Sequence, residues 1–155
     1  MASRAEWTQY AVPGWGVGEL WTADGVVLAH EFRFGSQGDT GATSELVDRL
    51  TAFLAGDDVS LAEAPLDLDW ATSFQRAVAD ALRAVPRGDV VSYGELAALA
   101  GYPGAARGVG TFCARNRFMF FVPCHRVVGA DGIGGYGSAG VGVKRRLLEL
   151  EGVRL

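Results

Sequence analysis

The sequence predicts an α+β protein with a small N-terminal α/β lobe, residues 1–66, and a mainly helical C-terminal domain, residues 67–155. Strand-like stretches come before the first helix-like stretch, and the later apolar residues mostly follow helical spacing. The charge is also divided: residues 1–84 carry 5 Lys and Arg against 13 Asp and Glu, whereas residues 85–155 carry 9 against 5. A basic second half indicates a polyanionic partner.

The N-terminal lobe is predicted to contain strands followed by one helix. The stretches "EWTQYAV" (6–12) and "GVVLAHEFRF" (25–34) have strand composition, and "PGWG" (13–16) is predicted to be the turn between them. The stretch 42–56 has helical spacing of its leucines and ends in a glycine. Residues 57–70 are expected to connect the two domains.

The C-terminal domain begins with a predicted helix over 72–85. Ser92 followed by Glu95 is a capping box, which opens a short helix. Gly101 is placed to end that helix, and Pro103 suits the first turn of the next one. Two short helices around a glycine turn form a helix-turn-helix candidate, although an ordinary helical hairpin has the same pattern.

The second helix of this pair has an unusually small surface. The stretch "PGAARGVGTFCARN" (103–116) offers alanines and glycines and no glutamine or asparagine within the helix to read base edges. Such a helix would approach DNA by shape and charge, with Arg107 as the one long side chain near its start. After it, 118–122 is predicted to be a buried extended segment, and 141–152 an amphipathic helix.

The stretch "VPCHRVVG" (122–129) contains the strongest candidate for chemistry. Cys124 becomes a nucleophile if an imidazole stabilises or generates its thiolate, and His125 is adjacent. Direct contact would need a tight turn after the proline, whereas a bound water could relay the proton. The carboxylates that could orient the imidazole are Glu149, Glu151 and Asp131. Alternatively, Cys124 is a small buried hydrophobic residue.

Several function classes are disfavoured by composition. No stretch approaches the roughly 18 apolar residues of a membrane span, and the N-terminus does not have a secretory pattern. Two cysteines give no disulfide framework, so we expect a reducing, cytoplasmic location. The cysteines and histidines lack metal-ligand spacing, and the glycines at 132–142 do not form a nucleotide-binding fingerprint. We therefore expect no metal and no cofactor.

Taken together, "SYGELAALAGYPGAARGVG", "RN" and "VPCHRVVGADGIGGYG…KRRLLELEG" resemble the O6-alkylguanine-DNA alkyltransferase family of direct-reversal DNA repair proteins. The resemblance covers about residues 70 to 152. It implies that the chain binds double-stranded DNA in the minor groove without sequence preference, as a monomer. It also implies a single-turnover transfer of a methyl or larger alkyl group from O6 of a flipped guanine to Cys124.

The resemblance assigns roles residue by residue. His125 would deprotonate Cys124 through a water, Glu151 would orient His125, and Asn116 would brace the active-site segment. Tyr93 would help to rotate the 3′ phosphate and assist the leaving guanine, and Arg107 would fill the gap left by the flipped base. The further DNA-contacting residues are expected to be Ala105, Ala106, Gly110, Arg115 and Arg117. The pocket is expected to be lined by Val127, Gly135, Tyr136 and Ser138.

The sequence departs from the family pattern at two places. Arg117 stands where relatives commonly have proline, and Tyr136 lies one residue closer to the cysteine than the family's loop tyrosine. Three rival functions are weaker. A lesion sensor of the alkyltransferase-like type would lack the acceptor cysteine, a helix-turn-helix regulator would need a base-reading face, and a cysteine hydrolase would need an oxyanion hole and a suitably placed base.

Overall fold

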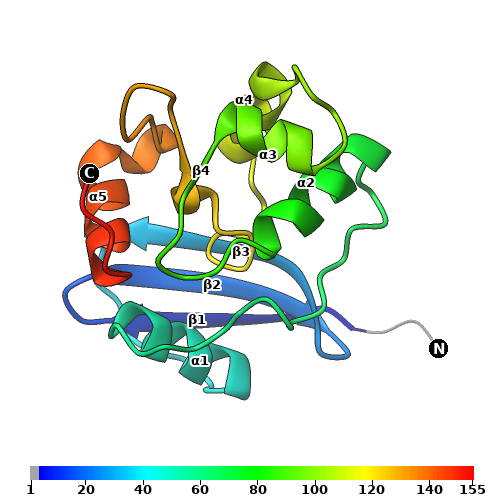
Figure 1. Ribbon diagram of the computed structural model, residues 1–155. Helices are drawn as coiled ribbons and strands as arrows, with labels where there is room; N and C mark the ends of the chain where they lie inside the picture. Colours follow the sequence, from blue (N-terminus) through cyan, green and yellow to red (C-terminus); the bar gives the residue numbers. More distant parts are fainter. Residues whose placement is uncertain (1–3) are drawn as a thin grey trace. The chain divides into compact units, whose positions relative to one another are not determined.

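The computed structural model describes residues 4–155, which form two compact units. Unit 1 contains residues 4–67 and the short segment Arg117–Phe121, and unit 2 contains Leu68–Asn116 and Val122–Leu155. Figure 1 shows the antiparallel sheet of unit 1 and the helices of unit 2. The mixed α+β architecture predicted from the sequence is confirmed. The domain boundary after residue 66 stays a prediction, since unit 1 also takes 117–121 from the later half.

Unit 1 is built on a three-stranded antiparallel sheet in the order β1 (Glu6–Val12), β2 (Gly16–Ala23) and β3 (Val26–Phe34). Asp24 and Gly25 join β2 to β3 and both have positive φ, +50° and +79°, as a two-residue hairpin turn requires. Strand β2 was not predicted from the sequence. Its alternation is masked because glycines occupy positions where large side chains would mark a face.

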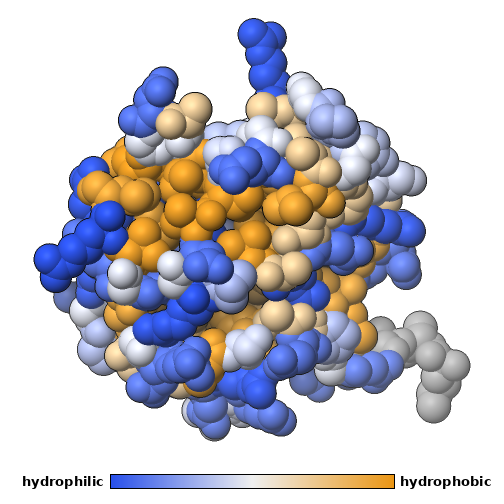
Figure 2. Space-filling view, viewed as in Figure 1, coloured by the Kyte–Doolittle hydropathy of each residue, from blue (hydrophilic) through white to orange (hydrophobic). Residues whose placement is uncertain are grey.

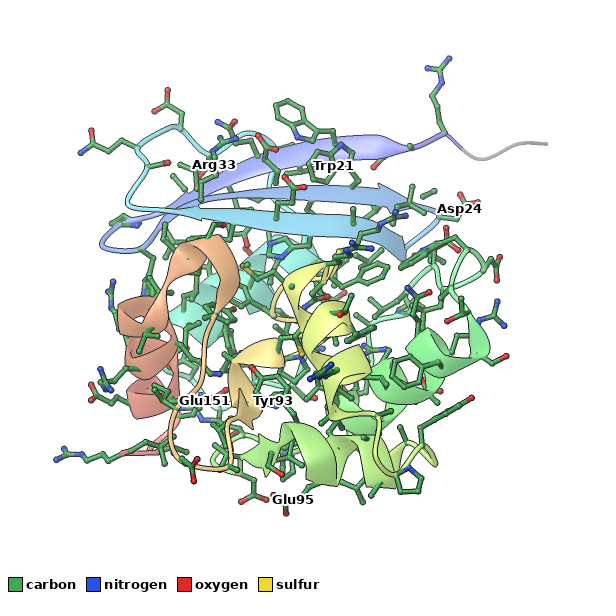
Figure 3. The ribbon with its side chains drawn as sticks, turned by 90° about the horizontal axis from the view of Figure 1, so that it is seen from above. Trp21, Asp24, Arg33, Tyr93, Glu95 and Glu151 are labelled. Atoms are coloured by element: carbon green, nitrogen blue, oxygen red, sulfur yellow. The ribbon has the colours of Figure 1, made fainter. Side chains whose placement is uncertain are left out.

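One face of the sheet is buried, and the other is mostly half-buried, with a few exposed side chains. Tyr10, Leu20 and Phe32 lie on the buried face, whereas Trp21 and Arg33 stand on the opposite face, as Figure 3 shows. Helix α1 (Glu45–Leu54) begins at the Ser44 side chain, which accepts a bond from the Val47 amide. The helix buries its apolar side, Val47, Leu50, Phe53 and Leu54. The predicted helix over 42–56 is therefore confirmed with shorter ends.

The segment 117–121 is fixed in unit 1 through His30. The His30 amide donates to the Arg117 carbonyl at 2.8 Å, and His30 Nδ1 donates to the Met119 carbonyl at 2.6 Å. His30 Nε2 then accepts from the Tyr10 hydroxyl at 2.7 Å. Phe120 has φ +73°, so the chain turns there. The prediction of an extended run over 118–122 is therefore wrong from Phe120 onward.

Unit 2 contains four α-helices and a two-stranded parallel sheet. The helices are α2 (Ser73–Arg83), α3 (Tyr93–Leu99), α4 (Ala106–Ala114) and α5 (Val141–Leu150), and the sheet pairs β4 (Val91–Ser92) with β5 (Val127–Val128). Two short 3₁₀ helices, Cys124–Arg126 and Gly137–Ala139, complete the unit. Figure 1 shows α3 and α4 side by side, which is the expected helical pair.

The ends of α3 confirm the sequence signals, whereas the start of α4 does not. Ser92 accepts from the Glu95 amide and Glu95 bonds back to the Ser92 amide, which is the predicted capping box. Gly101 follows the end of α3 with φ +89°, a conformation that glycine adopts without strain. Pro103 lies in the turn before α4, because the helix begins only at Ala106. The prediction that Pro103 occupies its first turn is wrong.

Candidate functional site

Cys124 lies at the first position of a 3₁₀ turn that follows Pro123 and leads into β5. Its side chain is buried, with 6% of the residue exposed. The turn is stabilised by the Arg126 amide, which donates to the Pro123 carbonyl at 2.9 Å. The tight turn that the sequence analysis required after the proline is therefore present, and it places Cys124 and His125 in one buried turn.

His125 is held by Glu151, which lies just after α5. His125 Nε2 donates to Glu151 Oε1 at 3.0 Å, and both side chains are fully buried. The residues alone left three carboxylates open, and the family resemblance selected Glu151. The structure brings this carboxylate to the imidazole. Glu149 and Asp131 are exposed. Figure 3 shows Glu151 inside unit 2, whereas Glu95 lies at its outer edge.

Arg126 also donates to the Glu151 carboxylate. Its Nε donates to Glu151 Oε1 at 3.0 Å and its Nη2 to Oε2 at 2.6 Å. Burial acts to raise the pKa of Glu151, but the hydrogen bonds from His125 and Arg126 outweigh it and hold that pKa at about 2. Glu151 is therefore an anion at neutral pH.

The protonation state of His125 follows from its surroundings. Burial lowers the pKa of His125 below its usual value, although the Glu151 carboxylate acts in the opposite direction. The ring is therefore neutral at pH 7. Because a carboxylate can only accept, Nε2 carries the proton and Nδ1 is the basic nitrogen of the ring.

The surroundings of Cys124 favour the protonated thiol at neutral pH. Burial raises its pKa well above the ordinary value, and a hydrogen bond with the Cys113 side chain acts in the same direction. A hydrogen bond from Asn116 and the charge of Lys144 favour the thiolate. Asn116 Nδ2 also donates to the Val122 carbonyl at 2.8 Å, so it braces the segment before the cysteine.

Lys144 is a central residue of the site that the sequence analysis missed. It is fully buried in α5, and its ammonium donates to the carbonyls of Val127 and, at 2.9 Å, Gly135. It also lies 6.0 Å from the centre of the Tyr93 ring. A lysine in an amphipathic helix is normally assigned to the solvent side, so only its position beside Val143 and Leu147 could have drawn attention to it.

The predicted pocket residues differ in exposure, and two of them, Val127 and Gly135, accept from Lys144 through their carbonyls. Val127 is buried, Tyr136 is partly exposed, and Gly135 and Ser138 are exposed. The pKa of Tyr136 is raised by burial and by the neighbouring thiols. The pKa of Tyr93 is raised for the same two reasons. Both phenols therefore carry their protons at neutral pH.

The expected DNA-contacting residues lie mostly on α4. Ala105 and Ala106 are half-buried at its start, and Arg107 and Arg115 are exposed at its two ends. A Cβ added at Gly110 would meet no atom within 4 Å, so nothing in the protein fills the space in front of it. Arg117 is exposed in unit 1.

Unit 2 also carries an open groove of about 750 Å³ along α2 and α3. Figure 2 shows apolar side chains gathered on this face of the molecule. The groove lining includes Asp89 and Glu95 but no cysteine or histidine, so it is separate from the Cys124 site. Within residues 4–155, no three His, Cys, Asp or Glu side chains gather as metal ligands. No helix in the same range is long and apolar enough to cross a membrane.

The comparisons with known proteins agree with this geometry. The family model described as the DNA-binding domain of 6-O-methylguanine DNA methyltransferase matches residues 73–153. The chain is 49% identical over 115 residues to the methylated-DNA–protein-cysteine methyltransferase of Mycobacterium tuberculosis, covering 73% of this chain and 67% of that protein. With the protein of the same name from Methanothermobacter thermautotrophicus, identity is 38% over 144 residues, 90% of this chain and 81% of that one.

A solved structure shows the same fold. The crystal structure of the Mycobacterium tuberculosis OGT protein in complex with DNA superposes with a TM-score of 0.80 at 38% identity, covering 94% of this chain and 92% of that one. The fold and the buried cysteine site define a protein of the alkyltransferase class. The chain belongs to the 6-O-methylguanine DNA methyltransferase family, which confirms the resemblance drawn from its motifs.

Proposed function

We propose that this protein repairs DNA by direct reversal, transferring an alkyl group from O6 of guanine to its own Cys124. The observation that carries the proposal is the buried hydrogen bond between Glu151 and His125, which lies in the same turn as Cys124. The named relatives are methylated-DNA–protein-cysteine methyltransferases, and one of the matched structures contains DNA.

The protonation states of the site residues fit such a transfer. Cys124 begins as a thiol and His125 as a neutral base, so the imidazole can take the thiol proton through a water. Glu151, already an anion, then stabilises the imidazolium that forms. Asn116 and Lys144 favour the thiolate electrostatically.

The transfer itself is a displacement at the alkyl carbon. The Cys124 sulfur forms a bond to that carbon while the bond from carbon to guanine O6 breaks, and the guanine leaves as it regains a proton. Tyr93, whose phenol is protonated, is the proposed donor to the leaving base. A thioether has no leaving group comparable to guanine, so each protein molecule acts once.

The surface of α4 suits binding without sequence preference. The small residues Ala105, Ala106 and Gly110 support entry of this helix into the minor groove. Arg107, exposed near its start, is proposed to occupy the space of a flipped base. Arg115 and Arg117 are proposed phosphate contacts. Val127, Gly135, Tyr136 and Ser138 are proposed to line the base pocket. We further propose that the protein acts as a monomer in the cytoplasm and needs no cofactor.

The test is intact-protein mass spectrometry after incubation with duplex DNA that contains O6-methylguanine. We expect one added methyl group per chain, located on Cys124 by peptide mapping, and no second addition when DNA is in excess. Tight binding to the lesion without any adduct would overturn transfer and indicate a lesion sensor instead. An undamaged duplex of the same sequence is the control.

A further inference from the structure

Cys113 is a second thiol in the site that the proposed transfer does not use. It lies in the last turn of α4 and is half-buried, whereas Cys124 is buried. The Cys113 side chain lies close enough to the Cys124 thiol to raise its pKa. Two cysteines 11 positions apart in the sequence thus come near each other within unit 2.

Asn116 links the segment of Cys113 to the segment of Cys124. The Asn116 amide donates to the Cys113 carbonyl at 3.3 Å, which ties it to the end of α4. The Asn116 side chain donates to the Val122 carbonyl at 2.8 Å and also bonds the Cys124 thiol. Asn116 therefore holds the end of α4 close to the segment that leads into the turn at Cys124.

Two further groups lie near both cysteines. The pKa of Lys144 is lowered by burial and raised by Cys113 and Cys124, so both side chains lie near its ammonium. The pKa of Tyr93 is raised by burial and by the same two cysteines. The Lys144 charge favours the thiolate form of Cys124, and thiolates are the reactive form toward oxidants.

We propose that Cys113 and Cys124 form a reversible intramolecular disulfide when the protein meets a hydroperoxide, so that Cys113 protects the acceptor sulfur from irreversible oxidation. The protective role rests on the proposed function of Cys124, whereas the disulfide itself does not. In a reducing compartment such a bond is transient, as is usual for redox-responsive cysteine pairs.

The chemistry balances with hydrogen peroxide as the oxidant. The more exposed Cys113 sulfur attacks one peroxide oxygen, the O–O bond breaks, and one water leaves together with a Cys113 sulfenic acid. The Cys124 sulfur then attacks the Cys113 sulfur and expels the hydroxyl group as a second water. Two thiols are oxidised by two electrons in total, and one peroxide is reduced to two waters. A dithiol reductant reduces the disulfide and restores both thiols.

The test treats the full-length reduced protein, without DNA, with a small excess of hydrogen peroxide. In the wild type we expect a single-chain mass lower by two hydrogens and a non-reduced peptide that joins the Cys113 and Cys124 segments. Transfer to O6-methylguanine DNA is lost and returns after dithiothreitol. In Cys113→Ser, the same dose adds oxygens to Cys124, and transfer does not return. Each protein is compared with its own transfer before oxidation.

Cys124→Ser is the matched variant for the first step. With no second thiol to resolve it, the Cys113 sulfenic acid persists and is labelled by a dimedone probe, whereas the wild type is labelled far less. Oxygen addition to wild-type Cys124 without a joined peptide overturns the proposal. A link between two chains, or equal recovery of the wild type and Cys113→Ser, overturns it as well.

The two proposals fail in distinguishable ways because the disulfide is detected without DNA. A joined peptide in a protein that takes no methyl group would leave the disulfide standing and remove alkyl transfer. Methyl transfer to Cys124 with no joined peptide after oxidation would do the reverse.

Discussion

Arg126 and Glu151 form a bidentate ion pair in which both carboxylate oxygens accept, at 3.0 and 2.6 Å. The Glu151 side chain is fully buried, so the arginine supplies the charge that keeps it ionised. The same carboxylate orients His125. Arg126 therefore acts on the chemistry through Glu151 and is a positioning residue, which explains why an arginine directly follows the cysteine and histidine.

We expect Arg126→Met to destabilise the protein by about 3 kcal/mol, because removing one partner leaves a buried carboxylate without its counter-charge. Methyl transfer should slow, since the pKa of Glu151 rises and its hold on His125 weakens. As the pH falls, transfer activity should be lost at a higher pH in the variant than in the wild type. Denaturant unfolding and the pH profile of single-turnover transfer measure both effects.

The matched control is Arg49→Met, which removes an exposed arginine 3.8 Å from Glu63. This surface pair should contribute less than about 1 kcal/mol. Similar losses for the two variants would contradict the role given to the buried pair.

A second prediction separates DNA binding from stability at α4. Gly110→Leu places a large side chain where no protein atom lies within 4 Å. The protein should stay as stable or gain up to about 1 kcal/mol, because leucine favours helix over glycine. Affinity for duplex DNA should fall at least about tenfold if this surface enters the groove. Fluorescence anisotropy and thermal unfolding give the two readouts.

Gly142→Leu in α5 is the control for that experiment, since a Cβ there also meets no atom within 4 Å. It repeats the same substitution in another helix of unit 2 and should leave DNA affinity nearly unchanged. Unaltered affinity in Gly110→Leu would remove α4 from the DNA interface.

The sequence predicted most of the helices because their signals are local. The Ser92–Glu95 capping box and Gly101 fix α3 from a few neighbouring residues. The strand β2 was missed because Gly16 and Gly18 hide its alternation, and its pairing with β1 and β3 is a long-range property.

The residues of the site also fall into those that the local sequence predicts and those that depend on the fold. The Cys124–His125 pair is visible as adjacent residues. The residues alone left three carboxylates open, the family resemblance selected Glu151, and the fold brings that carboxylate to the ring. The burial of Lys144 depends on carbonyls at Val127 and Gly135, which no local pattern announces. The proximity of Cys113 to Cys124 likewise arises only from the fold, which brings the end of α4 to the cysteine turn.

A third prediction concerns Arg107, the exposed long side chain at the start of α4. Arg107→Ala should slow methyl transfer from duplex DNA by about tenfold or more, since flipping leaves an unfilled gap in the stack. Reaction with free O6-alkylguanine base, which needs no flipping, should change little. Competition kinetics with both substrates tests this, and equal slowing would show that Arg107 acts elsewhere.

A fourth prediction uses Cys124→Ala to separate chemistry from binding. Transfer should disappear while affinity for duplex DNA stays within about threefold of the wild type, because the surface of α4 is untouched. The affinity of both proteins should fall with added salt along parallel lines, as phosphate contacts require. A large loss of binding, or no salt dependence, would contradict this division.

The last prediction concerns His30, whose ring links Tyr10 to the Met119 carbonyl in unit 1. Burial lowers the pKa of His30 to about 4, against the opposing effect of the Met119 hydrogen bond. In the unfolded chain, His30 titrates near pH 6.5. Between about pH 4 and pH 6.5, His30 is therefore mostly protonated in the unfolded state and neutral in the folded state. The contribution of neutral His30 to the free energy of unfolding is therefore fully present above about pH 6.5 and is lost as the pH falls toward 4. From pH 7 to pH 5 the loss should be about 2 kcal/mol.

His30→Gln removes this group, so its unfolding free energy should change by about 2 kcal/mol less than that of the wild type over the same pH range. Denaturant unfolding followed by tryptophan fluorescence at both pH values gives the comparison. The contribution of buried His125, which has the same sign, is common to both proteins and cancels. Parallel pH dependences would mean that folded His30 accepts a proton as readily as the unfolded chain, which its fully buried position among aromatic rings opposes.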